Sequence, residues 1–383
     1  MKIAHLSDSH LGYMQYHSPE RKRDFLDAFK LAVERALELG AEVIVHTGDL
    51  FESYQPDMES LDGVIQVLRQ VKERKVPFVA ITGNHDRAMR RGVYPPHKLL
   101  ENLGLLELID PLGTKTVKGV LFAGLRYHPR VHVKRIREQF FDGLSEEARR
   151  SDLSVFMFHQ ALDFILSYEG AYELLVSELP EGFDYYAAGH VHLFTYQKLS
   201  SGGLLAYAGA TEFRSKQEAQ RGRRGFNLVN LETGELERVE LEGLRPFVVE
   251  SFNQENAREV LKELLEKVRS FDKPPVVLLT YTYSTVDLNH FSDLLEQLYS
   301  LALAVRIQKI RQLDEQETVA ESRSYADYLK LFMGELKAPP KAVELGVELL
   351  SASPDSVPEI VEHFVREELG ELYGEIEERL KKC

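Results

Sequence analysis

The chain has 383 residues, of which 44% are hydrophobic and 28% are charged, a balance typical of a globular protein with two or three domains. No apolar run reaches the roughly 18 residues of a membrane span. The single cysteine is Cys383, so the sequence predicts a cytoplasmic protein without internal disulfides and without a membrane partner. The formal net charge of −14 argues against a protein that coats nucleic acid through an overall positive field, although local basic patches can still bind phosphates.

The first part of the chain alternates between short apolar strands and amphipathic helices. Strands are predicted at residues 2–6, 43–45 and 77–81, and helices at 25–39 and 59–74, where apolar residues recur at helical spacing. Each strand leads into polar residues: Asp8 and His10, then Asp49, then Asn84 and His85. Because β-α-β units place ligands at the carboxyl ends of their strands, we expect these side chains to meet at one edge of a sheet.

The same arrangement continues later in the chain. Strands are predicted at 120–124, 154–158 and 184–188; His159 follows the second of these, and His190 and His192 follow the third. Segments 204–207 and 225–230 are predicted to be later strands of a second sheet. Any one of these histidines alone is more often a structural residue, but ligand-type residues at five strand ends favour a single site.

The strand ends supply seven candidate metal ligands: Asp8, His10, Asp49, Asn84, His159, His190 and His192. Seven ligands are too many for one tetrahedral zinc ion but suit two ions about 3.5–4 Å apart, with one carboxylate bridging them. Mixed oxygen and imidazole ligands favour manganese, iron or zinc over magnesium. Two such ions can lower the pKa of a shared water and stabilise both oxygens of a phosphoester displacement, so the set predicts hydrolysis at phosphorus.

The motifs that carry these ligands resemble those of a known family. Asp8-x-His10, Gly48-Asp49, Gly83-Asn-His-Asp86, His159 and Gly189-His-x-His192 are similar to the motifs of calcineurin-like metallophosphoesterases. Asp8-Ser-His-Leu-Gly12, Gly48-Asp-Leu-Phe51, Leu179-Pro-Glu-Gly182 and Tyr185-Tyr-Ala-Ala-Gly-His190 most resemble the DNA double-strand-break repair nucleases called SbcD in bacteria and meiotic recombination eleven in archaea and eukaryotes. The resemblance covers about residues 1–245.

This resemblance implies an α/β (α+β) fold, a four-layer sandwich of two mixed sheets flanked by helices. It also implies a manganese-dependent DNA nuclease that acts as a double-strand exonuclease and a single-strand endonuclease. Two manganese ions per chain are implied. Asp8, His10, Asp49 and His192 would hold one ion, and Asp49, Asn84, His159 and His190 would hold the other. His85 would be a catalytic residue that stabilises the pentacovalent phosphate and helps to protonate the leaving oxygen.

The predicted DNA contacts include one position where the chain departs from the family. His17 matches a family position that faces nucleic acid, although a solvated loop histidine is an equal alternative. Glu52 replaces a histidine that lies near the scissile phosphate in the family; its carboxylate should repel phosphate, and Glu52→His should increase cleavage. Arg87, Arg90 and Arg91 follow the Asn84-His85 turn and are expected to contact DNA.

Two further regions follow the predicted nuclease domain of residues 1–245. Residues 246–312 have the pattern β-α-β-α-β and match the family's capping (DNA-binding) domain in position. Residues 313–383 contain amphipathic helical stretches and are predicted to bind the coiled-coil ABC-type ATPase called SbcC in bacteria, the alternative being a self-packed bundle. A homodimer is expected from two apolar stripes on helices, which could instead face the sheet: Leu61, Val64, Ile65, Leu68 and Val71, and Leu99, Leu100 and Leu103.

Two other functional classes are alternatives to the nuclease. One is a dinuclear-metal phosphodiesterase that acts on nucleotides or phosphoproteins; it would have no use for both extra regions. The other is a non-catalytic scaffold, which would be expected to have lost ligands. Because all seven are present, the sequence favours a nuclease that works on DNA in the cytoplasm, in association with the nucleoid.

Overall fold

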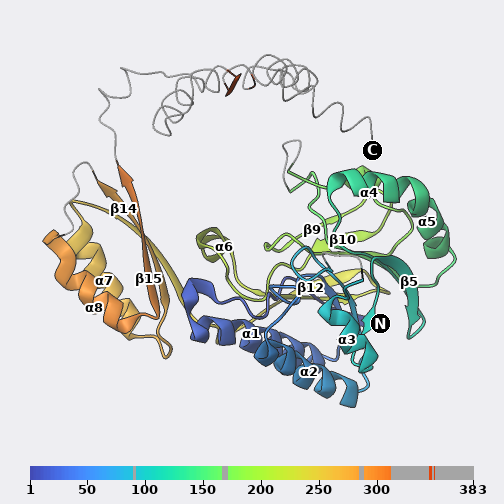
Figure 1. Ribbon diagram of the computed structural model, residues 1–383, viewed down its shortest axis with the longest axis horizontal. Helices are drawn as coiled ribbons and strands as arrows, with labels where there is room; N and C mark the ends of the chain where they lie inside the picture. The colour runs from blue at the N-terminus through green and yellow to red at the C-terminus, as the bar shows by residue number, and fades with distance from the viewer. Residues whose placement is uncertain (89–91, 166–170, 284–288, 312–344, 347–348, 350–383) are drawn as a thin grey trace, which may run out of the picture. The chain divides into compact units, whose positions relative to one another are not determined.

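A computed structural model describes residues 1–88, 92–165, 171–283 and 289–311, together with residues 345, 346 and 349 (Figure 1). The first of its sheets has six strands in the order β12-β11-β1-β2-β3-β4. These are β1 (Lys2–Leu6), β2 (Val43–Thr47), β3 (Phe78–Ile81), β4 (Glu107–Leu108), β11 (Gly225–Asn230) and β12 (Glu235–Glu240). Strands β1 to β4 run parallel, so the predicted β-α-β units are confirmed.

The second sheet also has six strands, in the order β5-β6-β7-β8-β10-β9. These are β5 (Leu112–Val117), β6 (Val120–Leu125), β7 (Ser154–Phe158), β8 (Tyr185–Ala188), β9 (Thr195–Lys198) and β10 (Leu204–Tyr207). Strands β6, β7, β8 and β10 run parallel, while β5 and β9 pair antiparallel at the edges. Both sheets are therefore mixed.

One strand lies in a different sheet from the one that the sequence predicted. Strand β11 belongs to the first sheet, where it pairs antiparallel with β1 and places Val229 opposite Ile3. Of the two later strands, only β10 joins the second sheet. Strand β11 is buried on both faces, and its mostly apolar pattern indicates burial without showing which sheet the strand joins.

The two sheets pack face to face, and helices cover their outer faces. Side chains alternate along β1, so Ile3 lies in the core between the sheets with Val155, while Ala4 lies in the core that contains Phe25 of α1. The layers are completed by α1 (Pro19–Glu38) and α2 (Met58–Glu73) on the first sheet and by α4 (Arg130–Ile136) and α5 (Asp142–Arg149) on the second. The predicted four-layer sandwich is confirmed.

Further short helices and helical turns occur between these elements and in the region that follows the sandwich. They are α3 (Pro96–Asn102), α6 (Lys216–Arg221), the 3₁₀ turns η1 (Gln15–His17), η3 (Val176–Glu178) and η4 (Asn289–Phe291), and the π-helical turn η2 (Arg137–Phe141). Helix α1 begins where Ser18 accepts a hydrogen bond from the backbone N–H of Arg21, with Pro19 in the first turn. The loop between β1 and α1 therefore ends at Ser18, the residue after His17.

Residues 247–311 form a third sheet with the order β13-β14-β15. Its elements follow the predicted sequence: β13 (Phe247–Asn253), α7 (Ala257–Arg269), β14 (Val276–Tyr283), α8 (Ser292–Leu301) and β15 (Ala304–Arg311). Leu261 of α7 and Leu298 of α8 are buried, as their helical spacing requires. Arg245, just before β13, donates to Asp24 of α1 through Nε at 2.6 Å and Nη2 at 3.0 Å.

The predicted ATPase-binding helices lie outside the described residues, apart from residues 345, 346 and 349. Among the helices that the structure describes, none has the length and apolar character needed to cross a membrane.

Candidate metal centre

The seven predicted ligands meet where the carboxyl ends of the two parallel strand sets face each other. Asp8, His10, Asp49 and Asn84 follow strands β1, β2 and β3 of the first sheet, and the three histidines follow β7 and β8 of the second. Residues separated by up to 184 positions, from Asp8 to His192, therefore lie in one cluster. The structure brings together all seven.

One oxygen of Asp49 lies between the two halves of this cluster. Asp49 Oδ2 is 3.8 Å from Nε2 of His10 and 3.4 Å from Nε2 of His159. Its other oxygen, Oδ1, accepts a hydrogen bond of 2.9 Å from the backbone N–H of His85. This arrangement fits a carboxylate that bridges two cations through Oδ2 while the protein holds Oδ1.

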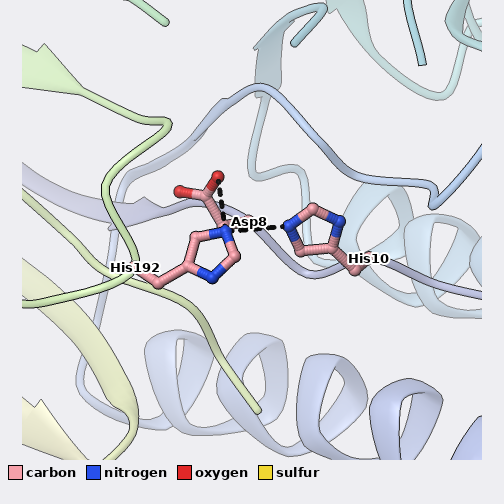
Figure 2. A group of neighbouring side chains, drawn as sticks. All are labelled: Asp8, His10 and His192. Atoms are coloured by element: carbon pink, nitrogen blue, oxygen red, sulfur yellow. Dashed lines mark hydrogen bonds and ion pairs between the residues drawn. The ribbon is translucent and has the colours of Figure 1, made fainter. Parts of the chain in front are cut away.

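The first half of the cluster contains Asp8, His10 and His192 (Figure 2). The Nε2 atoms of the two imidazoles are 3.1 Å apart, and Nε2 of His192 lies 3.7 Å from Oδ1 of Asp8. Two imidazole nitrogens and a carboxylate oxygen that point at one place form a donor set for a divalent transition metal.

The second half is built around the side-chain oxygen of Asn84. This Oδ1 lies 3.1 Å from Nε2 of His159 and 3.0 Å from Nδ1 of His190. The opposite nitrogen of His159, Nδ1, donates to the backbone carbonyl of Thr47 at 2.7 Å. Because Nδ1 then carries the proton, the lone pair of Nε2 is directed at the site, as a metal ligand requires.

Four of the seven residues have a backbone that L-amino acids rarely adopt: φ is 51° at Asp8, 47° at His10, 53° at Asp49 and 86° at His190. Such conformations cost about 1–3 kcal/mol each and persist where the surrounding structure holds them. Gly83 is required for the same close packing, since a Cβ there would lie 2.1 Å from Oδ1 of Asp49. The backbone at these strand ends therefore adopts unfavourable conformations that bring the candidate ligands together, and these conformations lower local stability.

Burial keeps two of the imidazoles uncharged. Burial, helped by the neighbouring His159, lowers the pKa of His190 to about 3, and burial lowers the pKa of His10 well below its usual value. Burial opposes protonation of His159 too, but the adjacent Asp49 raises its pKa to about 9. A metal ion binds the neutral imidazole, which His10 and His190 already offer and which His159 provides by releasing its proton, so the residues present fit two divalent metal ions.

His85 lies beside the cluster, and its side chain is partly exposed. Its ring meets the ring of His10 edge to face at 4.9 Å, and its Nδ1 lies 3.2 Å from the backbone carbonyl of Glu52. Glu52 itself accepts from Nη2 of Arg214 at 2.9 Å, and its other oxygen lies 2.9 Å from Nδ1 of His10, a close contact that is not aligned as a hydrogen bond. The Glu52 carboxylate is therefore paired with cationic and polar groups.

The predicted DNA contacts are only partly described. His17 is exposed at the end of η1, and the Arg87 guanidinium lies 5.2 Å above the ring of Tyr127. Arg90 and Arg91 lie outside the described residues. Arg21, four residues after His17, is fully buried and paired with Asp24, so it is a core residue.

Three residues that the sequence analysis left without a role contact the cluster. Asp86 accepts from the backbone N–H of Gly83 at 2.8 Å and of Phe51 at 3.1 Å, which ties together the loops of Asn84 and Asp49. The Tyr127 ring lies 5.4 Å from that of His190. Glu218 hydrogen-bonds His192, and only its place in a Ser215-x-x-Glu218 capping pattern was visible in the sequence.

A sandwich of two mixed sheets with a carboxylate, amide and imidazole cluster at their shared edge defines the metal-dependent phosphoesterases, and the family model for calcineurin-like phosphoesterases matches residues 1–194. Two proteins named "DNA double-strand break repair protein Mre11" are similar to this chain. The protein of Archaeoglobus fulgidus is 30% identical, and the match covers 88% of this chain and 82% of that protein. The protein of Haloferax volcanii is 31% identical, and the match covers 85% of this chain and 71% of that protein. A third, from Saccharolobus solfataricus, is 32% identical, and the match spans 57% of each chain. The chain therefore belongs to the Mre11 family of calcineurin-like phosphoesterases, which are dinuclear-metal phosphodiesterases.

Proposed function

We propose that this protein is a manganese-dependent nuclease that cleaves phosphodiester bonds at DNA ends during double-strand-break repair. The observation that carries the proposal is the position of Asp49 Oδ2 between His10 and His159, which suits two ions bridged by one carboxylate. The names of the similar proteins supply the substrate class. Oxygen and imidazole ligands in this proportion favour manganese, iron or zinc over magnesium.

The ligand assignment follows the two halves of the cluster. Asp8, His10, Asp49 and His192 would hold one ion, and Asp49, Asn84, His159 and His190 the other. Bound there, the ions would make a water nucleophilic at neutral pH and neutralise the charge of the phosphate. The water oxygen forms a new bond to phosphorus as the bond from phosphorus to the leaving oxygen breaks.

We assign the protonation of that leaving oxygen to His85. Its backbone N–H is bound to Asp49, and its Nδ1 faces the carbonyl of Glu52, so the main chain and one ring nitrogen are both held. Nε2 is then the nitrogen for proton transfer to the substrate. A partly exposed imidazole next to the candidate metal ligands can reach the substrate and transfer a proton to it.

Two cationic side chains near the cluster could bind the DNA backbone. Arg87 lies over Tyr127, whose ring contacts that of His190, and Arg214 lies 4.6 Å above the ring of Tyr13 with Nη1 3.2 Å from His10. Guanidinium groups bind phosphate oxygens, and the adjacent rings limit their motion. The path for the scissile strand would therefore run between these two arginines.

Replacing His85 and Asp49 separates catalysis from metal binding. We expect His85→Ser to retain both ions and to lose about 10²–10⁴-fold in cleavage rate, because proton transfer to the leaving oxygen is lost. Asp49→Ala should lose metal as well as activity, because this carboxylate serves both ions. Cleavage of end-labelled duplex DNA and metal content by mass spectrometry would measure both effects.

Full manganese occupancy in Asp49→Ala would refute the bridging assignment, and metal loss in His85→Ser would make His85 a ligand. The parent protein should cleave duplex ends faster than bis(p-nitrophenyl) phosphate at equal manganese. The reverse preference would favour the other candidate class, a phosphodiesterase acting on nucleotides or phosphoproteins.

The remaining regions extend this proposal. Residues 246–312 would act as the capping domain that holds DNA over the metals, and residues 313–383 would bind an SbcC-type coiled-coil ATPase. A nuclease of this kind would work in the cytoplasm, at the nucleoid.

A further inference from the structure

Helix α6 carries a carboxylate that touches one of the predicted ligands. The helix begins at Ser215, whose Oγ accepts a hydrogen bond of 3.2 Å from the backbone N–H of Glu218. The Ser215 hydroxyl also donates to Oε1 of Glu218 at 3.1 Å. This local pairing fixes the Glu218 side chain over the first turn of its own helix, where it is nearly buried.

Glu218 and Arg224 hold His192 at two places. Oε1 of Glu218 accepts from Nδ1 of His192 at 3.0 Å. Its Oε2 accepts from the backbone N–H of Arg214 at 3.1 Å and from Nη1 of Arg224 at 3.3 Å. The same Nη1 donates to the backbone carbonyl of His192 at 2.8 Å. The ring and the main chain of His192 are therefore fixed by one ion pair.

The carboxylate also decides which nitrogen of His192 is protonated. An ionised carboxylate only accepts hydrogen bonds, so in the neutral imidazole Nδ1 carries the proton and Nε2 has the lone pair. Nε2 is the atom that lies 3.1 Å from His10 and 3.7 Å from Asp8. Glu218 thus directs the lone pair of His192 to the place where those two ligands also converge.

We propose that Glu218 is a positioning residue that sets the metal affinity of the Asp8, His10 and His192 position through its hydrogen bond to His192. The inference rests on the proposed two-metal site. The other position depends on a different group, since His159 is oriented by the backbone carbonyl of Thr47. Loss of the Glu218 carboxylate should consequently weaken one of the two metal-binding events and leave the other in place.

Glu218→Gln tests this with little change in shape. The Glu218 carboxylate has two acceptor oxygens, whereas a glutamine amide has one acceptor oxygen and one NH₂ donor. In the variant, either His192 or the pair of Arg214 and Arg224 therefore loses its acceptor. Replacing the partner of a metal-binding histidine typically costs about 10–100-fold in metal affinity. Calorimetric titration of the full chain with Mn²⁺ should show one of two binding events weakened by about that factor, with the second changed little.

Glu212→Gln is the matched control, because Glu212 is also a buried glutamate of the same segment and contacts Arg21 and Phe213. It should lower the melting temperature while both binding events stay as in the parent. Glu218→Asp, which keeps the charge but shortens the side chain, should weaken the same single event and serves if the glutamine variant fails to fold.

Two binding events of parental affinity in both Glu218 variants would overturn the inference and leave the proposed function intact. Equal weakening of both events would also overturn it, since the effect would then not be confined to His192. A parent protein that binds no Mn²⁺ would overturn the proposed function itself and the inference with it.

Discussion

At the scale of single residues, the repulsion between Glu52 and a bound phosphate depends on the side chains beside Glu52. As a carboxylate near a bound phosphate, Glu52 was predicted to repel the substrate. Its side chain instead lies between Arg214 and His10, with both oxygens at 2.9 Å from nitrogen atoms. Because the pair of Glu52 and Arg214 is close to neutral, its repulsion of phosphate is smaller than that of an isolated carboxylate.

The ion pair leads to a prediction for Glu52→Gln. Removal of the carboxylate leaves the Arg214 guanidinium unbalanced beside the substrate path, so KM for DNA ends should fall. A partly exposed pair is worth about 0.2–1 kcal/mol, which corresponds to a KM about 1.5- to fivefold lower. Steady-state kinetics at low and high salt would measure this, and the gain should shrink as ions screen Arg214.

Glu52→Asp keeps the negative charge and is the control, for which KM should change little. A KM for Glu52→Gln that is unchanged at low salt would show that Arg214 does not reach the substrate. The increase in cleavage predicted for Glu52→His depends on the same balance, since a histidine also removes the partner of Arg214.

At the scale of elements, the helices expected to form a dimer divide into a buried and an exposed part. Val64, Leu68 and Val71 of α2 are buried against the first sheet, so most of this stripe belongs to the core. On α3 and at its end, Leu99 is 45% exposed and Leu103 is 46% exposed. These two exposed leucines make α3 a better candidate than α2 for a surface between two copies of the chain.

We therefore expect a homodimer in which α3 contributes Leu99 and Leu103. The double variant Leu99→Asp, Leu103→Asp should become a monomer, because two carboxylates would be buried at the interface. Light scattering at micromolar concentration measures the mass directly. Leu100→Ala, a core change at a fully buried position, should lower stability but keep the dimer. A parent that is monomeric would contradict the dimer.

At the scale of the whole molecule, the predicted metal site lies between the two sheets. Its candidate ligands come from the first sheet through Asp8, His10, Asp49 and Asn84, and from the second through His159, His190 and His192. Metal ions bound by both groups would cross-link the sheets in addition to the apolar core between them. Metal binding should therefore stabilise the fold as well as support catalysis.

Thermal unfolding with and without manganese tests this link. Binding at a hundredfold excess over Kd contributes about 2.7 kcal/mol per site, so the melting temperature should rise by several degrees and return when a chelator is added. Asp49→Ala should melt at the same temperature in both conditions. A parent whose melting temperature does not respond to manganese would argue against a site that spans both sheets.

A truncation addresses the other end of the chain. Deleting residues beyond about 320 should leave the dimer and the manganese-dependent cleavage, because all the predicted ligands precede that point, and should remove binding to the ATPase. Pull-down with a purified SbcC-type ATPase is the measurement. Unimpaired binding by the truncated protein would place the partner site elsewhere.

The sequence by itself determined the class of fold and the candidate ligands. Short apolar strands alternate with amphipathic helices, and each candidate ligand lies within four residues after the end of a strand, as at Asp49 after β2 and His159 after β7. These signals are local, because side-chain periodicity and the residue after a strand are set by the backbone geometry of a few neighbouring positions. For that reason both could be recognised without knowing how the strands pair.

Only the tertiary structure decided which groups meet across the chain. It placed β11 beside β1, paired Glu52 with Arg214 across 162 positions, and brought Glu218 to His192. Strand order and such contacts depend on the packing of whole layers, and a buried strand or a charged residue has the same local pattern whichever partner it finds. The partners that orient the candidate ligands were therefore invisible in the sequence, while the candidate ligands themselves were marked by local motifs.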